Sequence, residues 1–189
     1  MQLVDAQTPD AVPVTVWWLQ QTDPGQVRAP SSEPAVEPVL LQARRPAPSL
    51  SRYCYLEVGG PWSWVDRVGW DDDAWLRWVG RPGHELWTCW VDGVLAGYFE
   101  LDGSGSVELA YFGLTQPFQG VGLGGWLLAE ALRQAWSRPT TTRVWVHTCS
   151  LDGPTALANY EARGLVRYDE KVEWRLADRT GPSGGAGHE

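Results

Sequence analysis

The chain has 189 residues, of which 43% are hydrophobic and 12% aromatic, so it can bury one sizeable core but is too short for two ordinary domains. Its formal net charge of −8 at pH 7 argues against a nucleic-acid partner, because binding to phosphate backbones depends largely on Lys and Arg. No apolar run approaches the ~20 residues of a membrane span, and no basic-then-apolar leader is visible. We therefore expect a cytoplasmic protein with no membrane partner, whose acidic surface suits a cationic substrate.

The 13 tryptophans are the most unusual feature of the composition. They are consistent with an aromatic binding surface. They are equally consistent with GC-rich coding, because Lys171 is the single lysine among 15 basic residues. Composition alone leaves both interpretations open.

Prolines are concentrated in residues 1–48, which also contain two strand-like runs at 12–20 and 36–43. Because proline is tolerated at sheet edges and in turns but not in central strands, we expect an N-terminal arm with one or two edge strands. Residues 179–189 are rich in Gly and cannot bury apolar area, so they are predicted to be a disordered tail. The functional domain should lie in residues 49–178.

The pattern within that domain predicts two short helices, then three strands, and then alternating helices and strands. Residues 48–80 favour two short helices, the second of which begins at Asp71-Asp72-Asp73, where acids suit the positive helix end. Three antiparallel strands should follow, separated by glycine-containing turns. The expected ranges are strands 85–92, 94–102 and 106–114, helix 122–136, strand 143–149, helix 154–162, and a final strand or pair of strands over 165–176. This order predicts an α/β (α+β) single domain with a mixed sheet and helices on its faces.

The three cysteines, Cys54, Cys89 and Cys149, are odd in number and far apart, with no C-x-x-C and no His at ligand spacing. We therefore expect neither a disulfide framework nor a metal site, and interpret them as reduced core thiols. Cys149 closes the predicted strand 143–149, where a nucleophile can sit, but nothing else in the sequence marks it as activated.

A glycine-rich segment links the predicted strand 106–114 to the helix that follows it. It comprises Gln119, Gly120, Val121, Gly122, Leu123, Gly124 and Gly125. Such a helix start exposes backbone N–H groups beside the positive helix end, where a phosphate can approach because no Cβ intervenes. A tight turn without a ligand is the alternative. A Walker loop is excluded because Gly-Lys-Ser/Thr is missing, and the preceding antiparallel hairpins disfavour a Rossmann unit.

Two motifs in this region resemble those of one enzyme superfamily. Gln119-x-x-Gly122-x-Gly124 resembles the R/Q-x-x-G-x-G/A signature of the GNAT superfamily of acyl-CoA-dependent N-acyltransferases, and Ala156-x-x-x-Tyr160-x-x-x-Gly164-Leu165 resembles its A-x-x-x-Y-x-x-x-G-F element. The resemblance covers about residues 84–176 and implies the GNAT fold. Two departures are Leu165 in place of Phe, and 152–154 (Asp-Gly-Pro) where the family commonly has an Asn.

The resemblance implies that acetyl-CoA is the co-substrate and that the glycine-rich segment holds its pyrophosphate. Backbone groups of Phe112, Gly113 and Leu114 would then meet the pantetheine arm and the thioester. The implied reaction is acetyl transfer to a primary amine of a small molecule or peptide by direct attack in a ternary complex. A non-catalytic GNAT-fold module that binds coenzyme A or a partner is the alternative, and a homodimer is left open.

The chemistry requires a base for the amine and an acid for the leaving thiolate. Tyr160 matches the family's general-acid position, although a packed helix aromatic is the simpler alternative. Glu108 is our candidate base, because the resemblance places it, at the start of the strand that leads to the loop, where some GNAT enzymes carry a catalytic glutamate. Its apolar sequence context would also raise the carboxyl pKa. A solvated acid or a partner of an Arg is the alternative for Glu108.

The resemblance implies that the early helices and neighbouring strands shape the acceptor side. These segments are aromatic and acidic here, which favours an amine through cation–π contact and charge attraction. The candidate substrate-binding residues are Trp62, Trp64, Trp70, Glu100 and His147. A helical core stripe is the alternative explanation for the tryptophans that follow, Trp75 and Trp78.

Overall fold

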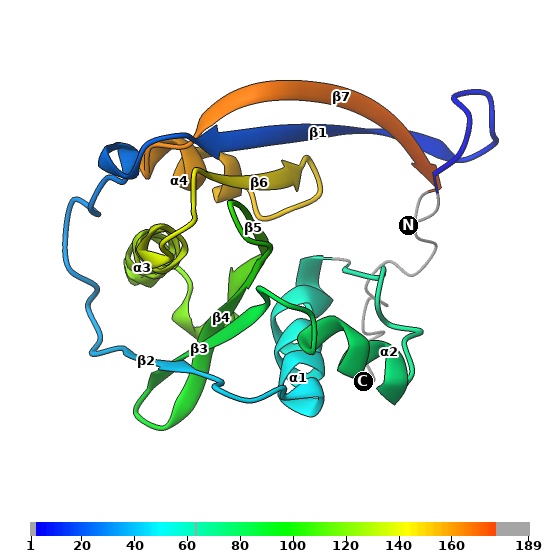
Figure 1. Ribbon diagram of the computed structural model, residues 1–189. Helices are drawn as coiled ribbons and strands as arrows, with labels where there is room; N and C mark the ends of the chain where they lie inside the picture. Colours follow the sequence, from blue (N-terminus) through cyan, green and yellow to red (C-terminus); the bar gives the residue numbers. More distant parts are fainter. Residues whose placement is uncertain (1–2, 63, 177–189) are drawn as a thin grey trace, which may run out of the picture.

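The computed structural model describes residues 3–62 and 64–176, which form a seven-stranded sheet with helices on both faces (Figure 1). The sheet order is β2-β3-β4-β5-β6-β1-β7, and β5 and β6 form its parallel pair. The strands are β1 (Ala11–Gln21), β2 (Val39–Gln42), β3 (Glu85–Val91), β4 (Val94–Asp102), β5 (Ser106–Leu114), β6 (Arg143–Cys149) and β7 (Val166–Leu176). The helices are α1 (Pro48–Gly59), α2 (Asp72–Val79), α3 (Leu123–Ser137) and α4 (Ala156–Ala162). The predicted mixed α/β class is confirmed, and the expected tail at 179–189 lies outside the described residues.

Strands β3, β4 and β5 form the predicted antiparallel meander. The turn between β3 and β4 is made by Asp92 and Gly93, with φ of 50° and 79°. Positive φ at both central residues is the requirement of the two-residue hairpin turn whose twist matches that of the flanking strands. The Asp-Gly signal in the sequence therefore located this hairpin correctly.

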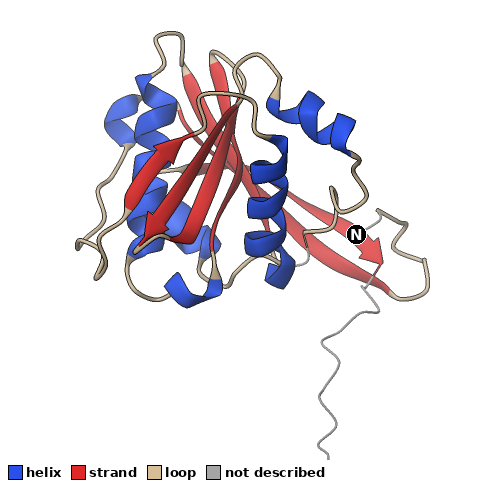
Figure 2. Ribbon diagram, turned by 90° about the horizontal axis from the view of Figure 1, so that it is seen from below, coloured by secondary structure: helices blue, strands red, loops and turns tan. Residues whose placement is uncertain are grey.

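Strand β1 is not the edge element that its prolines suggested. It lies between β6 and β7, pairing with β6 through Val16–Gln21 and with β7 from Ala11 onward. Pro13 precedes the part of β1 that pairs with β6, so its missing N–H leaves that ladder intact. Beyond β6 the β1–β7 pair continues as a two-stranded ribbon, seen projecting from the sheet in Figure 2. Strand β2 does lie at the edge, beside β3, as expected.

The sheet opens in its middle because β5 and β6 pair over only a short stretch. Their parallel register covers Ser106–Glu108 against Arg143–Trp145, and the two strands then diverge. Within β5, Leu109 and Tyr111 lie opposite consecutive residues of β4, which leaves Ala110 as the extra residue of a β-bulge. The second halves of β5 and β6 are thereby free to form the two walls of a cleft.

Different helices cover the two faces of the sheet (Figures 1 and 2). On one face α3 buries the apolar stripe that its sequence predicted, and α4 packs beside it. On the other face α1 covers the region of Tyr98 through Cys54 and Val58, with α2 packed against α1. Asp71 caps α2 by accepting a hydrogen bond from the N–H of Ala74 at 2.8 Å. Among residues 3–62 and 64–176, no helix has the length and apolar character needed to cross a membrane.

Candidate active site between the diverging strands

A pocket of about 1010 Å³ occupies the gap between β5 and β6. It also touches the start of α3, the helix α4 and the segment that joins α1 to α2. Most of the residues singled out in the sequence line it, namely Phe112, Gly113, Leu114, Gln119, Gly120, Gly122, Gly124, Gly125, Tyr160, Trp62, Trp64 and His147. Val121 and Leu123 belong to the core beneath the loop instead, because Leu123 is fully buried and Val121 packs against the same cluster.

The glycine-rich loop has a backbone that only glycine adopts easily. Gly120 and Gly122 have φ of 79° and 81°, and Gly122 is the N-cap of α3. No side chain caps this helix start, so the first-turn N–H groups have no side-chain partner. A Cβ added at Gly120 would meet no atom within 4 Å. The loop is thus an uncapped helix start with open space at Gly120, while the backbone of residues 33–34 lies beside Gly122; an anion can approach from the Gly120 side.

A cation that the sequence analysis missed lies beside this helix start. Arg163 follows α4, and its Nη1 atom would lie 3.2 Å from a Cβ placed on Gly125. Its Nε atom is buried and has no hydrogen-bond partner among the described residues. Asn159 is also close, donating from Nδ2 to the carbonyl of Gly124 at 3.2 Å. Guanidinium and helix N-terminus together fit a phosphate. The signal available in the sequence was the position of Arg163 inside the tyrosine motif.

Tyr160 of α4 forms part of the pocket wall. Its side chain is almost fully buried, and its ring centroid lies 6.1 Å from that of Phe112. Burial raises the pKa of Tyr160 well above the ordinary tyrosine range, and the charge of Asp152 adds to this effect. The hydroxyl therefore stays protonated, and it is available as a proton donor.

Glu108 and His147 form a pair across the point where β5 and β6 separate. Glu108 does not itself line the pocket, but its Oε1 atom lies 3.4 Å from Nδ1 of His147, which does. The imidazole is about half exposed. The Glu108 carboxylate raises the pKa of His147 above its ordinary value, and burial opposes part of the rise. The titratable group that faces the pocket here is thus His147, with Glu108 behind it.

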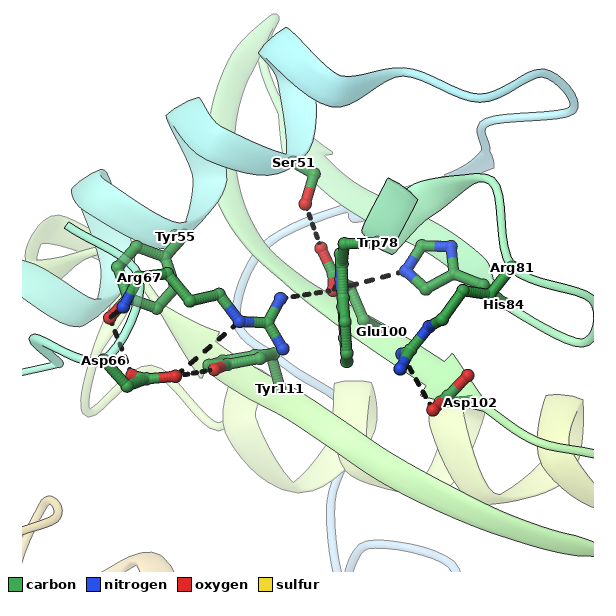
Figure 3. A network of polar contacts seen from close by, with 10 residues as sticks. All are labelled: Ser51, Tyr55, Asp66, Arg67, Trp78, Arg81, His84, Glu100, Asp102 and Tyr111. Carbon is green, nitrogen blue, oxygen red and sulfur yellow. Dashed lines mark hydrogen bonds and ion pairs between the residues drawn. The ribbon is translucent and has the colours of Figure 1, made fainter. Parts of the chain in front are cut away.

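Two of the predicted substrate residues, Glu100 and Trp70, do not line the pocket, and Figure 3 shows the surroundings of Glu100. Glu100 is 1% exposed beneath α1 and α2, where it accepts hydrogen bonds from Ser51 Oγ and Trp78 Nε1, each at 2.5 Å. Trp70 packs against Trp75, with ring centroids 5.2 Å apart. The expectation that Glu100 and Trp70 face a substrate is not met, because Glu100 is buried beneath α1 and α2 and neither residue lines the pocket.

Aromatic side chains, including Trp62 and Trp64, line another part of the pocket. Trp62 contacts Gly153, since a Cβ on that glycine would lie 3.4 Å from the indole. The Trp64 ring lies edge-on to Tyr111, with centroids 5.0 Å apart. Asp66 is the carboxylate of this region that reaches the pocket, and its side chain is 62% exposed. Trp62 therefore lies close to both sides of the cleft, and Asp66 gives this part of the cleft a negative charge.

The cysteines and possible metal ligands add little to this site. All three cysteines are free thiols; Cys54 and Cys89 are buried, and Cys149 lines the pocket. Burial raises the pKa of Cys149, so its thiol is not activated as a nucleophile. In the part of the chain that the structure describes, no group of three or more His, Cys, Asp or Glu side chains is placed to hold a metal ion.

Comparison with known proteins identifies the family. The model of the Acetyltransferase (GNAT) family matches residues 51–165, which is more than half of the chain. The chain therefore belongs to the GNAT family, whose members are in general acyltransferases. No match was found among curated proteins.

Solved structures show the same fold at low sequence identity. A GCN5-related N-acetyltransferase from Kribbella flavida is 18% identical, with a TM-score of 0.59 over 85% of this chain and 57% of its own. One from Sphaerobacter thermophilus is 16% identical, with a TM-score of 0.61 over 87% of this chain and 52% of its own. An aminoglycoside acetyltransferase from an uncultured soil metagenomic sample is 10% identical, with a TM-score of 0.56 over 67% of this chain and 86% of its own. The chain thus spans just over half the length of the first two.

Proposed function

We propose that the protein transfers an acetyl group from acetyl-CoA to a primary amine of a small molecule or peptide, by direct attack in a ternary complex. The observation that carries this proposal is that one continuous pocket lies between β5 and β6. It joins the glycine-rich helix start at one end to an aromatic and acidic wall at the other. An anionic co-substrate and a cationic acceptor can therefore meet without leaving the cleft.

The residues that would hold the co-substrate are those of the loop and of β5. The N–H groups at Gly120, Gly122 and Gly124, together with the Arg163 guanidinium, supply local positive potential for a pyrophosphate. This reconciles an anionic ligand with a chain of net charge −8. The splayed half of β5 has no β6 partner, so its backbone is free to bind the pantetheine arm. Acetyl-CoA, when bound, supplies an acyl thioester that an amine can attack.

The pocket also contains groups that can move the two protons of the reaction. An ammonium must lose a proton before its nitrogen can form the new C–N bond, and Nε2 of His147 can accept that proton because Nδ1 faces Glu108. Glu108, our sequence candidate for the base, thereby becomes a positioning residue. As the C–S bond breaks, the leaving sulfur needs a proton, and the Tyr160 hydroxyl is our candidate donor because its raised pKa keeps it protonated, although the same rise makes it a weaker acid.

The test is a pair of measurements on the whole chain. Calorimetry with acetyl-CoA and with CoA measures binding, and release of free thiol in the presence of a mixed panel of primary amines measures transfer. We expect binding at micromolar concentration and amine-dependent thiol release. Binding without amine-dependent release would instead support a non-catalytic module, and absence of binding would overturn the proposal.

A further inference from the structure

The aromatic end of the pocket presents a carboxylate whose orientation is fixed in advance (Figure 3). Asp66 accepts a hydrogen bond from the hydroxyl of Tyr55 at 2.8 Å through Oδ1 and from that of Tyr111 at 2.6 Å through Oδ2. Burial raises the pKa of both tyrosines, so both stay protonated as donors. Each carboxylate oxygen can accept a further hydrogen bond, and the side chain is 62% exposed. Asp66 is therefore held in place yet open toward the pocket.

The neighbouring charges leave Asp66 incompletely neutralised. Arg67 is 5% exposed; its Nε lies 3.6 Å from Asp66 and its Nη1 3.7 Å from Glu100. One guanidinium between two carboxylates leaves a formal net charge of −1 on these three side chains. Since Glu100 is sealed in the interior by its own hydrogen bonds, the excess negative charge is accessible at Asp66.

The location of Asp66 separates it from the reacting groups. Tyr111 belongs to the half of β5 that diverges from β6. Its hydroxyl, at the end of the side chain, contacts Asp66, so Asp66 lies the length of a tyrosine side chain from the β5 backbone. His147 is on the opposite wall, formed by β6, and Tyr160 is on α4. A cation bound at Asp66 is therefore distinct from the nitrogen that would react between these walls.

We propose that Asp66 determines acceptor specificity by binding a second, non-reacting cationic group, so that the preferred acceptor is a diamine or another amine with two cationic groups. The apolar body of this acceptor lies along Trp62 and Trp64, whose rings line the pocket beside Asp66. Aromatic faces next to a carboxylate favour a cation over a neutral group. This inference rests on the proposed acetyl transfer in the same pocket.

The experiment compares hexylamine with hexamethylenediamine, which share one chain length and differ in the second ammonium. For the wild-type chain we expect kcat/KM for the diamine to exceed that for the monoamine by about tenfold. Asp66→Asn should abolish this preference mainly through KM for the diamine, so that kcat/KM for the two amines becomes similar. Asp73→Asn is the matched control, because it removes an exposed carboxylate that does not line the pocket. We expect it to leave both substrates unchanged.

A second measurement needs no variant. Raising the ionic strength should increase KM for the diamine more than for the monoamine, because the contact at Asp66 is an exposed charge pair. Equal rates for the two amines in the wild type, or equal losses on both in Asp66→Asn, would overturn the inference and leave acetyl transfer standing. Transfer to other amines of the mixed panel but to neither of these two would overturn the inference alone. Binding of CoA with no transfer to any amine would overturn both proposals.

Discussion

Glu108 Oε1 lies 3.4 Å from Nδ1 of His147, and the two residues sit on adjacent strands where the parallel register of β5 and β6 ends. The last registered pair is Glu108 with Trp145, so His147 is two residues further along β6 and on the same face. The sheet therefore holds the carboxylate, while the imidazole lines the open cleft. This arrangement links the pKa of a pocket residue to a group outside the pocket.

Removing the Glu108 charge should shift the pH dependence of acetyl transfer. In the wild type, Glu108 raises the pKa of His147, so the imidazole stays protonated, and unable to act as a base, up to a higher pH. In Glu108→Gln this pKa falls, and we expect the acid limb of kcat/KM to move to lower pH while the plateau decreases because the base is weaker. Glu57→Gln, on the exposed surface of α1, is the control. An unshifted acid limb in Glu108→Gln would exclude His147 as the base.

The start of α3 should accept a methyl group but not a carboxylate at position 124. A Cβ on Gly124 would make ordinary contacts, 3.6 Å from Leu114 Cδ1 and 3.9 Å from Asn159 Nδ2. Gly124→Ala should therefore keep its affinity for CoA within about threefold, whereas Gly124→Glu, which places an anion against the pyrophosphate site, should weaken it at least tenfold, about 1.4 kcal/mol. Both variants should fold, because Ala is a good helix former and an acid suits the first turn of a helix. Calorimetry measures the affinities, and equal affinities would contradict this location of the site.

Arg163 should contribute to CoA affinity through charge. We expect Arg163→Gln to weaken CoA binding by about fivefold, about 1 kcal/mol, and to reduce the dependence of binding on salt concentration. The matched control is Arg133→Gln, which removes an exposed arginine on α3 that pairs with Glu130. Titrations at low and high salt test this prediction. If the two variants behave alike, Arg163 does not contact the anion.

Glu100 should matter for stability and not for substrate recognition. Replacing it with Gln leaves the Arg67 guanidinium, which is 5% exposed, without its buried counterion. Breaking a buried ion pair in this way costs about 3 kcal/mol. We expect the free energy of unfolding in urea to fall by about this amount in Glu100→Gln, with KM for the acceptor little changed. Glu57→Gln again serves as the exposed control. A large KM effect with unchanged stability would return Glu100 to the acceptor site.

These contrasts show which parts of the site were predictable. The glycine-rich loop is encoded locally, because strand, turn and helix signals are contiguous and positive-φ positions favour glycine. Tyr160 was available as a candidate from the resemblance of the segment 156–165 to a motif of the GNAT superfamily. The burial of Glu100 could not be predicted, because the sequence does not say which face of β4 the helices α1 and α2 cover. The proposed role of His147 depends on the register between β5 and β6. In that register Glu108 pairs with Trp145, which is 37 residues further along the chain.

The same reasoning explains the error about β1. Proline indicates that a strand has a partner on one side only at that position. This holds at Pro13, which pairs with β7 but not with β6. It says nothing about whether partners from the far end of the chain will flank the rest of the strand. Trp18 lies opposite His147 on one side and Asp169 on the other.

The insertion of β1 between β6 and β7 also sets an order of folding. The meander of β3, β4 and β5 joins neighbouring segments, whereas the β6 wall of the cleft is held by a strand more than a hundred residues away in the chain. Such distant pairings form slowly, because the entropy of closing a long loop must be overcome before the contacts contribute. We therefore expect the β6 half of the cleft to form last during folding.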